Sequence, residues 1–318
     1  MSGRDAGDSA EWFFDRPFRP GEVEALADGV ATWLGSEPMR WLVENLAPRS
    51  LQGSPAGLDE VLDRFGEICD WARPGTVWDY RESGERRLEE DSASASPELR
   101  DEVAARATAL GLRSEGALQA KPSTFVVLGG RRLAPLNRAR AAAAAMRRQP
   151  DVPARVVMLC GRRALDPAER ESEEVGGYAP AARTESELMT AAAERAFAAA
   201  PPAEVRIFEV PDPPSGGRAS TYETLRAFGG GPEADGGPLA IVTSPTCRPF
   251  QYLEAVRAIG LTTGRTFELI AHPPAWAAAS PAGAAAPHAP HVYLQEIRSV
   301  IQAAGRLARA LSPARTSA

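Results

Sequence analysis

The sequence predicts an α/β protein: a doubly wound, mainly parallel five-stranded Rossmann-like sheet with an N-terminal helical domain. Two observations support this class. After residue 120, five short apolar runs each precede a segment with helical character. That alternation is typical of a parallel sheet covered by helices on both faces. Before residue 118, apolar residues recur at helical spacing and no strand pattern is evident.

The order of elements follows from this alternation. Strands are expected at residues 123–128, 155–160, 205–210, 238–244 and 265–271. Helices are expected at residues 134–148, 184–199, 220–228, 249–259 and 292–310. Right-handed crossovers join such units into one doubly wound sheet. Because these sheets bind ligands outside the carboxyl ends of their strands, each candidate site residue should follow a strand.

The N-terminal half carries helix signals of its own. Residues 23–34 and 58–71 place apolar side chains at helical spacing. Ser96, followed by Pro97, predicts the N-cap of a further helix. The predicted domains are therefore a helical N-terminal domain at 1–118, a Rossmann-like domain at 119–311 and a disordered tail at 312–318.

Composition limits the classes of function. The charged fraction of 25% and hydrophobic fraction of 44% are those of a soluble globular protein, and no apolar run is long enough to cross a membrane. The three cysteines are far apart, without metal-ligand spacing, which favours a reducing cytoplasm and no metal site. No basic helix face with interleaved aromatic residues indicates nucleic-acid binding. The expected partner is a small anionic or nucleotide-like molecule, and a homo-oligomer is left open.

Two strands end in related sequences, VVLGGRR at 126–132 and VMLCGRR at 157–163. Gly129 and Gly130 would allow a tight turn and close approach of a ligand to the backbone. Arg138, expected in the first turn of the following helix, and Arg163 could each bind a phosphate or carboxylate. A surface position for Arg138 is an equally good interpretation.

Candidate acid–base residues lie at two helix starts. Glu185 follows Thr184, which with Glu187 forms a predicted capping box, so Glu185 is freer to face the ligand. Glu223 begins the next helix after a predicted cap at Ser220 and Thr221, whose exposed N–H groups could bind an anion. Glu185 and Glu223 are the candidate general acids or bases.

The fourth strand ends in a polar segment, TSPTCRPFQ at 243–251. Hydroxyl groups, a thiol and an arginine gathered after a buried strand favour a ligand loop over a routine turn. Cys247 lacks a nearby histidine that would activate its thiol for covalent chemistry. The ligand-binding candidates in this loop are Thr243, Ser244, Arg248 and Gln251.

Taken together, the stretches VVLGG, CGRR, TESELM, STYETL and VTSPTCRPFQYLEAVRAIG resemble the YdcF/SanA/ElyC family of Rossmann-like proteins. The closest likeness is to uncharacterised actinobacterial members with an extra N-terminal helical segment, and it covers residues 121–272. Three positions depart from the family pattern, where Ser220 replaces Asn, Cys247 replaces His and Phe250 replaces Arg. Because one family member is reported to bind S-adenosylmethionine, the resemblance implies that this molecule is a candidate cofactor. Matching positions are Gly129, Gly130, Arg163, Glu185, Thr221, Glu223, Thr243 and Ser244.

The leading functional hypothesis is a cytoplasmic small-molecule-binding protein that acts on or with a nucleotide-type or S-adenosylmethionine-type ligand. The interpretation leans towards an enzyme of undetermined reaction. One alternative is a hydrolase or transferase of phosphoryl or glycosyl groups, and another is a non-enzymatic metabolite sensor or scaffold. If the helical domain closes over the ligand, it is expected to contribute Asp79, Arg81 and Arg86; a salt-bridged loop is the alternative interpretation of these residues.

Overall fold

The computed structural model describes residues 11–46, 96–214, 219–231, 237–271 and 290–311. Contacts divide the chain into two compact units that are not continuous in sequence. One is helical and comprises residues 1–16, 21–114 and 287–318, and the other is an α/β unit of residues 17–20 and 115–286. The last helix thus belongs to the helical unit, whereas the sequence-based boundaries assigned it to the Rossmann-like domain.

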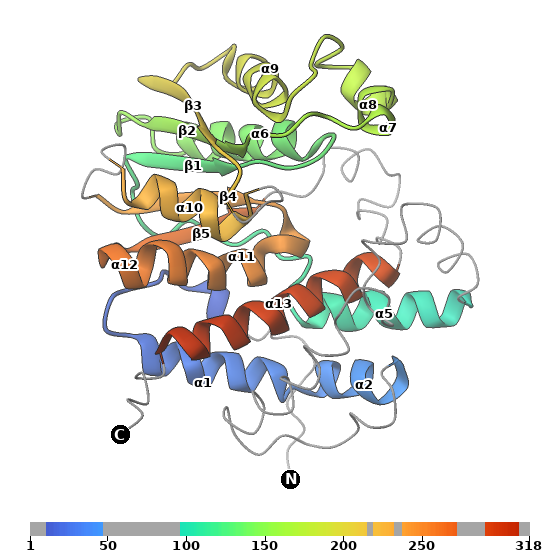
Figure 1. Cartoon of the computed structure of the whole chain (residues 1–318). Coiled ribbons are helices and arrows are strands. Elements are labelled where there is room, and N and C mark those ends of the chain that lie inside the picture. The colour runs from blue at the N-terminus through green and yellow to red at the C-terminus, as the bar shows by residue number, and fades with distance from the viewer. Residues whose placement is uncertain (1–10, 47–95, 215–218, 232–236, 272–289, 312–318) are drawn as a thin grey trace. The chain divides into compact units, whose positions relative to one another are not determined.

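The α/β unit contains a five-stranded sheet in which every neighbouring pair is parallel, in the order β3-β2-β1-β4-β5 (Figure 1). The expected five-stranded α/β fold is confirmed, and each strand lies within two residues of its predicted start and end. The strands are β1 (Thr124–Leu128), β2 (Arg155–Gly161), β3 (Glu204–Val210), β4 (Leu239–Thr243) and β5 (Phe267–Ala271).

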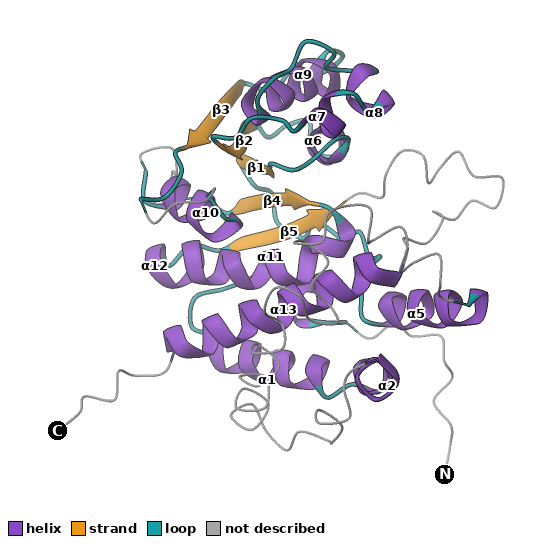
Figure 2. Cartoon of the chain, turned by 45° about the vertical axis from the view of Figure 1, so that its right-hand side comes forward, coloured by secondary structure: helices purple, strands orange, loops and turns teal. Residues whose placement is uncertain are grey.

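Helices cover both faces of this sheet (Figure 2). On one face, α6 (Ala134–Arg147) and α9 (Glu185–Phe197) share an apolar core with side chains from β1, β2, β4 and β5. Alanines dominate that side of α6, and they let the helix approach the sheet closely. Helix α10 (Thr221–Gly229) lies against β2 and β3, and α11 (Arg248–Ala255) lies against β5.

The connections between these helices and strands carry shorter elements. Two short helices, α7 (Pro167–Arg170) and α8 (Glu173–Gly176), lie between β2 and α9. Helix α11 continues into a π-helix at Val256–Gly260, and this helical segment ends with α12 (Leu261–Thr263). The predicted helix at 249–259 is therefore several residues longer than expected and irregular in its second half.

The helical unit contains α1 (Val23–Leu34), α2 (Glu37–Leu46), α5 (Pro97–Ala109) and α13 (Pro290–Leu311), after a 3-10 turn at Phe13–Asp15. Trp33 is fully buried, and its indole N–H donates to Leu110 O at 3.0 Å. Ser96 caps α5 as predicted, its hydroxyl accepting from Leu99 N at 3.2 Å. The predicted helix at 58–71 and the predicted tail at 312–318 lie outside the described residues. In the described part of the chain, no helix is long and apolar enough to cross a membrane.

Candidate functional site

The strand order defines a topological switch point between β1 and β4. The chain moves outward from β1 through β2 to β3 on one side, and from β4 to β5 on the other. Crossover connections diverge at such a point, which leaves the carboxyl ends of the two central strands accessible to a ligand. Among the residues that follow β1 and β4, Gly129, Gly130, Ser244 and Cys247 are partly exposed, whereas Pro245 and Thr246 are buried.

Arg138 joins the two strand ends. Its side chain is buried, with the residue 4% exposed, although it comes from α6 on one face of the sheet. Nε donates to Ser244 Oγ at 3.0 Å, and Nη1 donates to Leu128 O at 3.1 Å and to Gly129 O. Arg138 is the fifth residue of α6, just beyond the first turn in which it was predicted, and its side chain extends back to the switch point rather than to the surface.

The thiol of Cys247 lies beside this arginine. Cys247 Sγ is 3.9 Å from Arg138 Nη2 and 3.9 Å from Thr246 Oγ1. Cys247 is half-buried, whereas Cys160 is enclosed within β2. Burial raises the pKa of the Cys160 thiol to about 12, and the nearby charge of Glu185 adds to that rise. Cys160 is therefore an inert core thiol, and Cys247 is the thiol that lies next to the switch point.

The two glycines after β1 are required by close contacts within the protein. A Cβ atom on Gly129 would lie 2.5 Å from Glu185 Oε1 and 3.1 Å from Leu159 O. A Cβ atom on Gly130 would lie 2.9 Å from the Cβ of Ala134. Neither glycine has a positive φ. The two glycines let Glu185 and α6 approach the end of β1, and the predicted close approach of a ligand stays a prediction.

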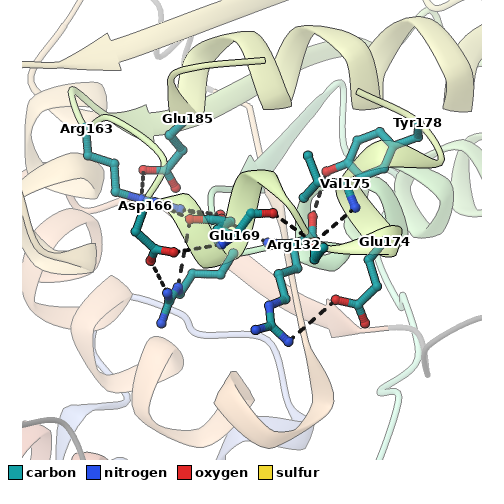
Figure 3. Close-up of polar contacts among 11 residues, drawn as sticks. Arg132, Arg163, Asp166, Glu169, Glu174, Val175, Tyr178 and Glu185 are labelled. Carbon is teal, nitrogen blue, oxygen red and sulfur yellow. Dashed lines mark hydrogen bonds and ion pairs between the residues drawn. The ribbon is translucent and has the colours of Figure 1, made fainter. Parts of the chain in front are cut away.

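Arg163, which follows β2, is held by two carboxylates (Figure 3). Nη1 and Nη2 contact the two oxygens of Glu169 at 2.7 and 3.0 Å, a bidentate geometry. Nε donates to Glu185 Oε2 at 3.2 Å. The Arg163 side chain is 10% exposed and that of Glu169 is 0% exposed. The neighbouring Arg162 instead faces outward and pairs with Glu209 at 2.9 Å.

These contacts determine the charge states of the network formed by Arg163, Glu169 and Glu185. Burial by itself would raise the pKa of Glu169, but hydrogen bonds from Arg163 and from the N–H of Arg132 outweigh it, so the pKa is below its ordinary value. Burial likewise opposes the charge of Arg163, but its pKa is raised because Glu169 and Glu185 stabilise the cation. The network therefore consists of ionised groups that satisfy one another.

The same acidic segment holds the loop after β1 in place. Glu169 accepts from Arg132 N at 3.0 Å, and Tyr178 donates its hydroxyl to Arg132 O at 2.6 Å (Figure 3). Asp166 caps α7 and pairs with Arg131. Arg132 has a φ of 48°, a left-handed conformation that is strained for a non-glycine residue. The contacts on both sides of its backbone maintain that conformation.

The two candidate acid–base residues occupy structural positions. Glu185 is 8% exposed and bound to Arg163. Glu223 completes a capping box, in which its Oε2 accepts from Ser220 N at 2.6 Å and its N–H donates to Ser220 Oγ at 3.3 Å. Thr184 and Glu187 form the capping box predicted for α9. The predicted catalytic roles of Glu185 and Glu223 stay predictions.

The remaining candidates on the β4 side are tied to neighbouring elements. Gln251 is 5% exposed, accepts from Thr243 Oγ1 and lies 3.5 Å from Thr221 Oγ1, so it links β4, α11 and α10. Arg248 is 1% exposed and donates Nε to Leu269 O at 3.1 Å. Its guanidinium also fills the space beside Gly116, which has a φ of 69°. Arg248 therefore points towards β5, while Arg138 and Ser244 lie at the switch point.

Two residues of this cluster of ion pairs, both in the segment 166–177 after β2, were not among the predicted site residues. Glu169 is its buried anion and Asp166 an N-cap. The available signal was the Asp-Pro-x-Glu spacing of a helix start. Among the described residues, no group of three His, Cys, Asp or Glu side chains could hold a metal ion. Asp79, Arg81 and Arg86 lie outside the described residues.

Comparison with known proteins gives one match. The family model of the Rv3785 N-terminal domain matches residues 19–111, which include α1, α2 and α5 of the helical unit. No curated protein and no solved structure matches the chain. The matched residues are less than half of the chain, and they lie outside the sheet.

The resemblance to the YdcF/SanA/ElyC family is therefore wrong, because the family that matches is a different one. Binding of nucleotides or S-adenosylmethionine, which rested on that resemblance, loses its support. The physical reason lies in the motifs themselves. Glycines at strand ends and Thr-x-x-Glu or Ser-x-x-Glu at helix starts meet local needs of backbone packing and capping. Unrelated α/β proteins share those needs in the same order.

Proposed function

We propose that the chain binds a small anionic molecule at the switch point between β1 and β4, where Arg138 supplies the positive charge. The observation that carries the proposal is the position of Arg138, a buried guanidinium bound to the ends of both central strands. A buried cation attracts an anion more strongly than an exposed one, because water screens it less. Ser244 and Cys247 would add a hydroxyl and a thiol beside the ligand.

The exposure of these strand ends supports this position. Gly129, Gly130, Ser244 and Cys247, which lie after β1 and β4, are partly exposed, so a molecule can reach them. The cysteines, which have no disulfide or metal-ligand spacing, favour a cytoplasmic setting for this binding.

The proposal concerns binding. Phosphoryl or glycosyl transfer through Glu185 or Glu223 gains no support from their contacts, since one is bound to arginine and the other caps a helix. A sensor that binds a metabolite without turnover is consistent with the same position.

The test is a thermal-unfolding series with inorganic phosphate, pyrophosphate and citrate as probes. A ligand at a hundred times its dissociation constant stabilises a protein by about 2.7 kcal/mol, so a saturable rise in melting temperature is expected with at least one probe. Arg138→Gln should abolish the rise and Ser244→Ala should reduce it. Arg162→Ala is the matched control, because it removes an exposed arginine at a neighbouring strand end. No response to any probe, or an equal response in Arg138→Gln, would overturn the proposal.

A further inference from the structure

The two edge strands of the sheet, β5 and β3, differ in whether other residues of the chain cover them. At β5, residues of the same chain occupy the outer edge: Phe18 N donates to Phe267 O at 2.8 Å, and Phe267 N donates to Phe18 O at 3.3 Å. The two rings stack at 5.2 Å, and further along the strand Ala271 N donates to Glu115 O at 2.6 Å. At the other edge the sheet ends with β3, and no further strand follows in the part of the chain that is described.

Strand β3 is also the least covered strand. The other four are buried along nearly their whole length, as strands of a parallel sheet usually are. In β3, residues 204–206 and 209 are exposed. Val205 is 42% exposed, one of only two large apolar side chains in the described residues that are so accessible. Figure 1 shows β3 as the outermost strand, beyond β2.

The direction of the backbone groups follows from the ladder. Arg155 N donates to Ser123 O on the β1 side of β2, so the odd-numbered residues of β2 face β1 and the even-numbered residues face β3. Arg162 N accordingly donates to Val210 O. The even-numbered residues of β3 therefore turn their peptide groups towards β2. Those of Val205, Ile207 and Glu209 point outward, where another strand can pair with them.

We propose that β3 pairs with β3 of a second copy of this chain, antiparallel about a two-fold axis at Val205, to form one continuous ten-stranded sheet. In this register Val205 forms a hydrogen-bonded pair with its counterpart. Glu204 then lies opposite the partner's Arg206 in a non-hydrogen-bonded pair, the type whose side chains approach most closely. The two-fold axis creates this pair twice.

The charges on β3 favour a second copy of the chain as the partner, and they also favour one pairing register. Glu204 and Arg206 lie on the same face of the strand, two residues apart and with opposite charges, so the edge is complementary to itself. Registers centred on Glu204 or on Arg206 would place like charges opposite each other, which is unfavourable. A register centred on Ile207 would place Arg206 opposite Phe208, so neither charge would face an opposite charge of the second copy. Within one chain, Glu204 lies 3.9 Å from Arg155 of β2. Only the register centred on Val205 pairs opposite charges and covers the exposed valine.

The test is the oligomeric state of the full chain, measured by sedimentation equilibrium over a concentration series. Wild type is expected to form dimers. Glu204→Arg and Arg206→Glu, each alone, replace two attractive pairs with two repulsive pairs and should weaken dimerisation about tenfold or more. The double variant Glu204→Arg/Arg206→Glu restores opposite charges across the axis and should recover the wild-type affinity.

Matched controls are Glu194→Arg and Arg140→Glu, which make the same charge changes at exposed positions of α9 and α6. They should leave the dimer unchanged. Because all four positions are exposed, circular dichroism is expected to show that every variant folds. A wild type that stays monomeric throughout, a dimer unaffected by the single changes, or a double variant that remains as weak as the single variants would each overturn the proposal.

Discussion

At the scale of single residues, the charged side chains of the α/β unit are mostly committed to one another. Glu169 is the clearest case, since a fully buried carboxylate receives both nitrogens of the Arg163 fork and the backbone N–H of Arg132. Breaking such an arrangement by removing one partner is costly, because the remaining charge stays buried without compensation. Glu169 is therefore expected to be a main determinant of stability.

Replacing Glu169 with Gln should lower the free energy of unfolding by about 3 kcal/mol. The amide keeps the size of the side chain but removes the charge that binds Arg163. Urea denaturation at neutral pH measures the loss. Glu171→Gln is the control, because this neighbouring glutamate is exposed and its replacement should change stability by less than about 0.5 kcal/mol.

The stability difference between wild type and Glu169→Gln is also expected to depend on pH. The folded-state pKa of Glu169 lies below its ordinary value, so its stabilisation is complete above the unfolded pKa of about 4.3. It is lost as the pH falls through the folded-state pKa. The difference in stability between wild type and Glu169→Gln should therefore narrow below pH about 4.3. A difference that stays constant down to pH 3 would show that the carboxylate charge is not its source.

At the scale of elements, strand ends and helix starts are held together by close contact. The side chains of Glu185 from α9 and Arg138 from α6 both pack against the end of β1. This close packing depends on the absence of a side chain at Gly129 and Gly130. Helices α9 and α10 begin with complete capping boxes, so their first-turn glutamates serve the helix. The packing of β1, α6 and α9 thus depends on glycine at specific positions.

Gly129→Ala should destabilise the chain by about 1–3 kcal/mol, because the new methyl group would collide with Glu185 and with the carbonyl of Leu159. Gly176→Ala, at the end of α8, is the comparison. No atom lies within 4 Å of the Cβ position there, and the change should be neutral or stabilise by up to about 1 kcal/mol. Urea denaturation of both variants provides the measurement. Equal effects would mean that Glu185 moves aside without cost.

At the scale of the whole molecule, residues far apart in sequence complete the sheet. Phe18, 2% exposed, stacks on Phe267 and also contacts the π-helix at Gly260. Residues 17–20 therefore belong to the α/β unit although the helical segments lie before and after them in the sequence. This short segment covers the edge of β5 that would otherwise be open.

Phe18→Ala should lower the free energy of unfolding of the α/β unit by about 3–5 kcal/mol, as expected for removing a buried phenylalanine. Arg19→Ala, at the adjacent exposed position, should have an effect within about 0.5 kcal/mol. Hydrogen exchange at the amides of β5 separates a local effect from a global one, and those amides should lose protection first. Unchanged stability in Phe18→Ala would show that the segment does not hold the edge.

Local sequence patterns predicted the elements and their order. Strands and helices follow from periodicity and capping, which are local properties, so the five strands and the caps at Ser96 and Thr184 were predicted correctly. Which charged side chains pair with one another became evident from the folded structure alone. Arg163 reaches Glu169, Arg138 reaches Ser244, and Arg248 turns towards β5. Those contacts depend on strand order and helix packing, and a linear pattern of residue types does not encode the distance between side chains on different elements.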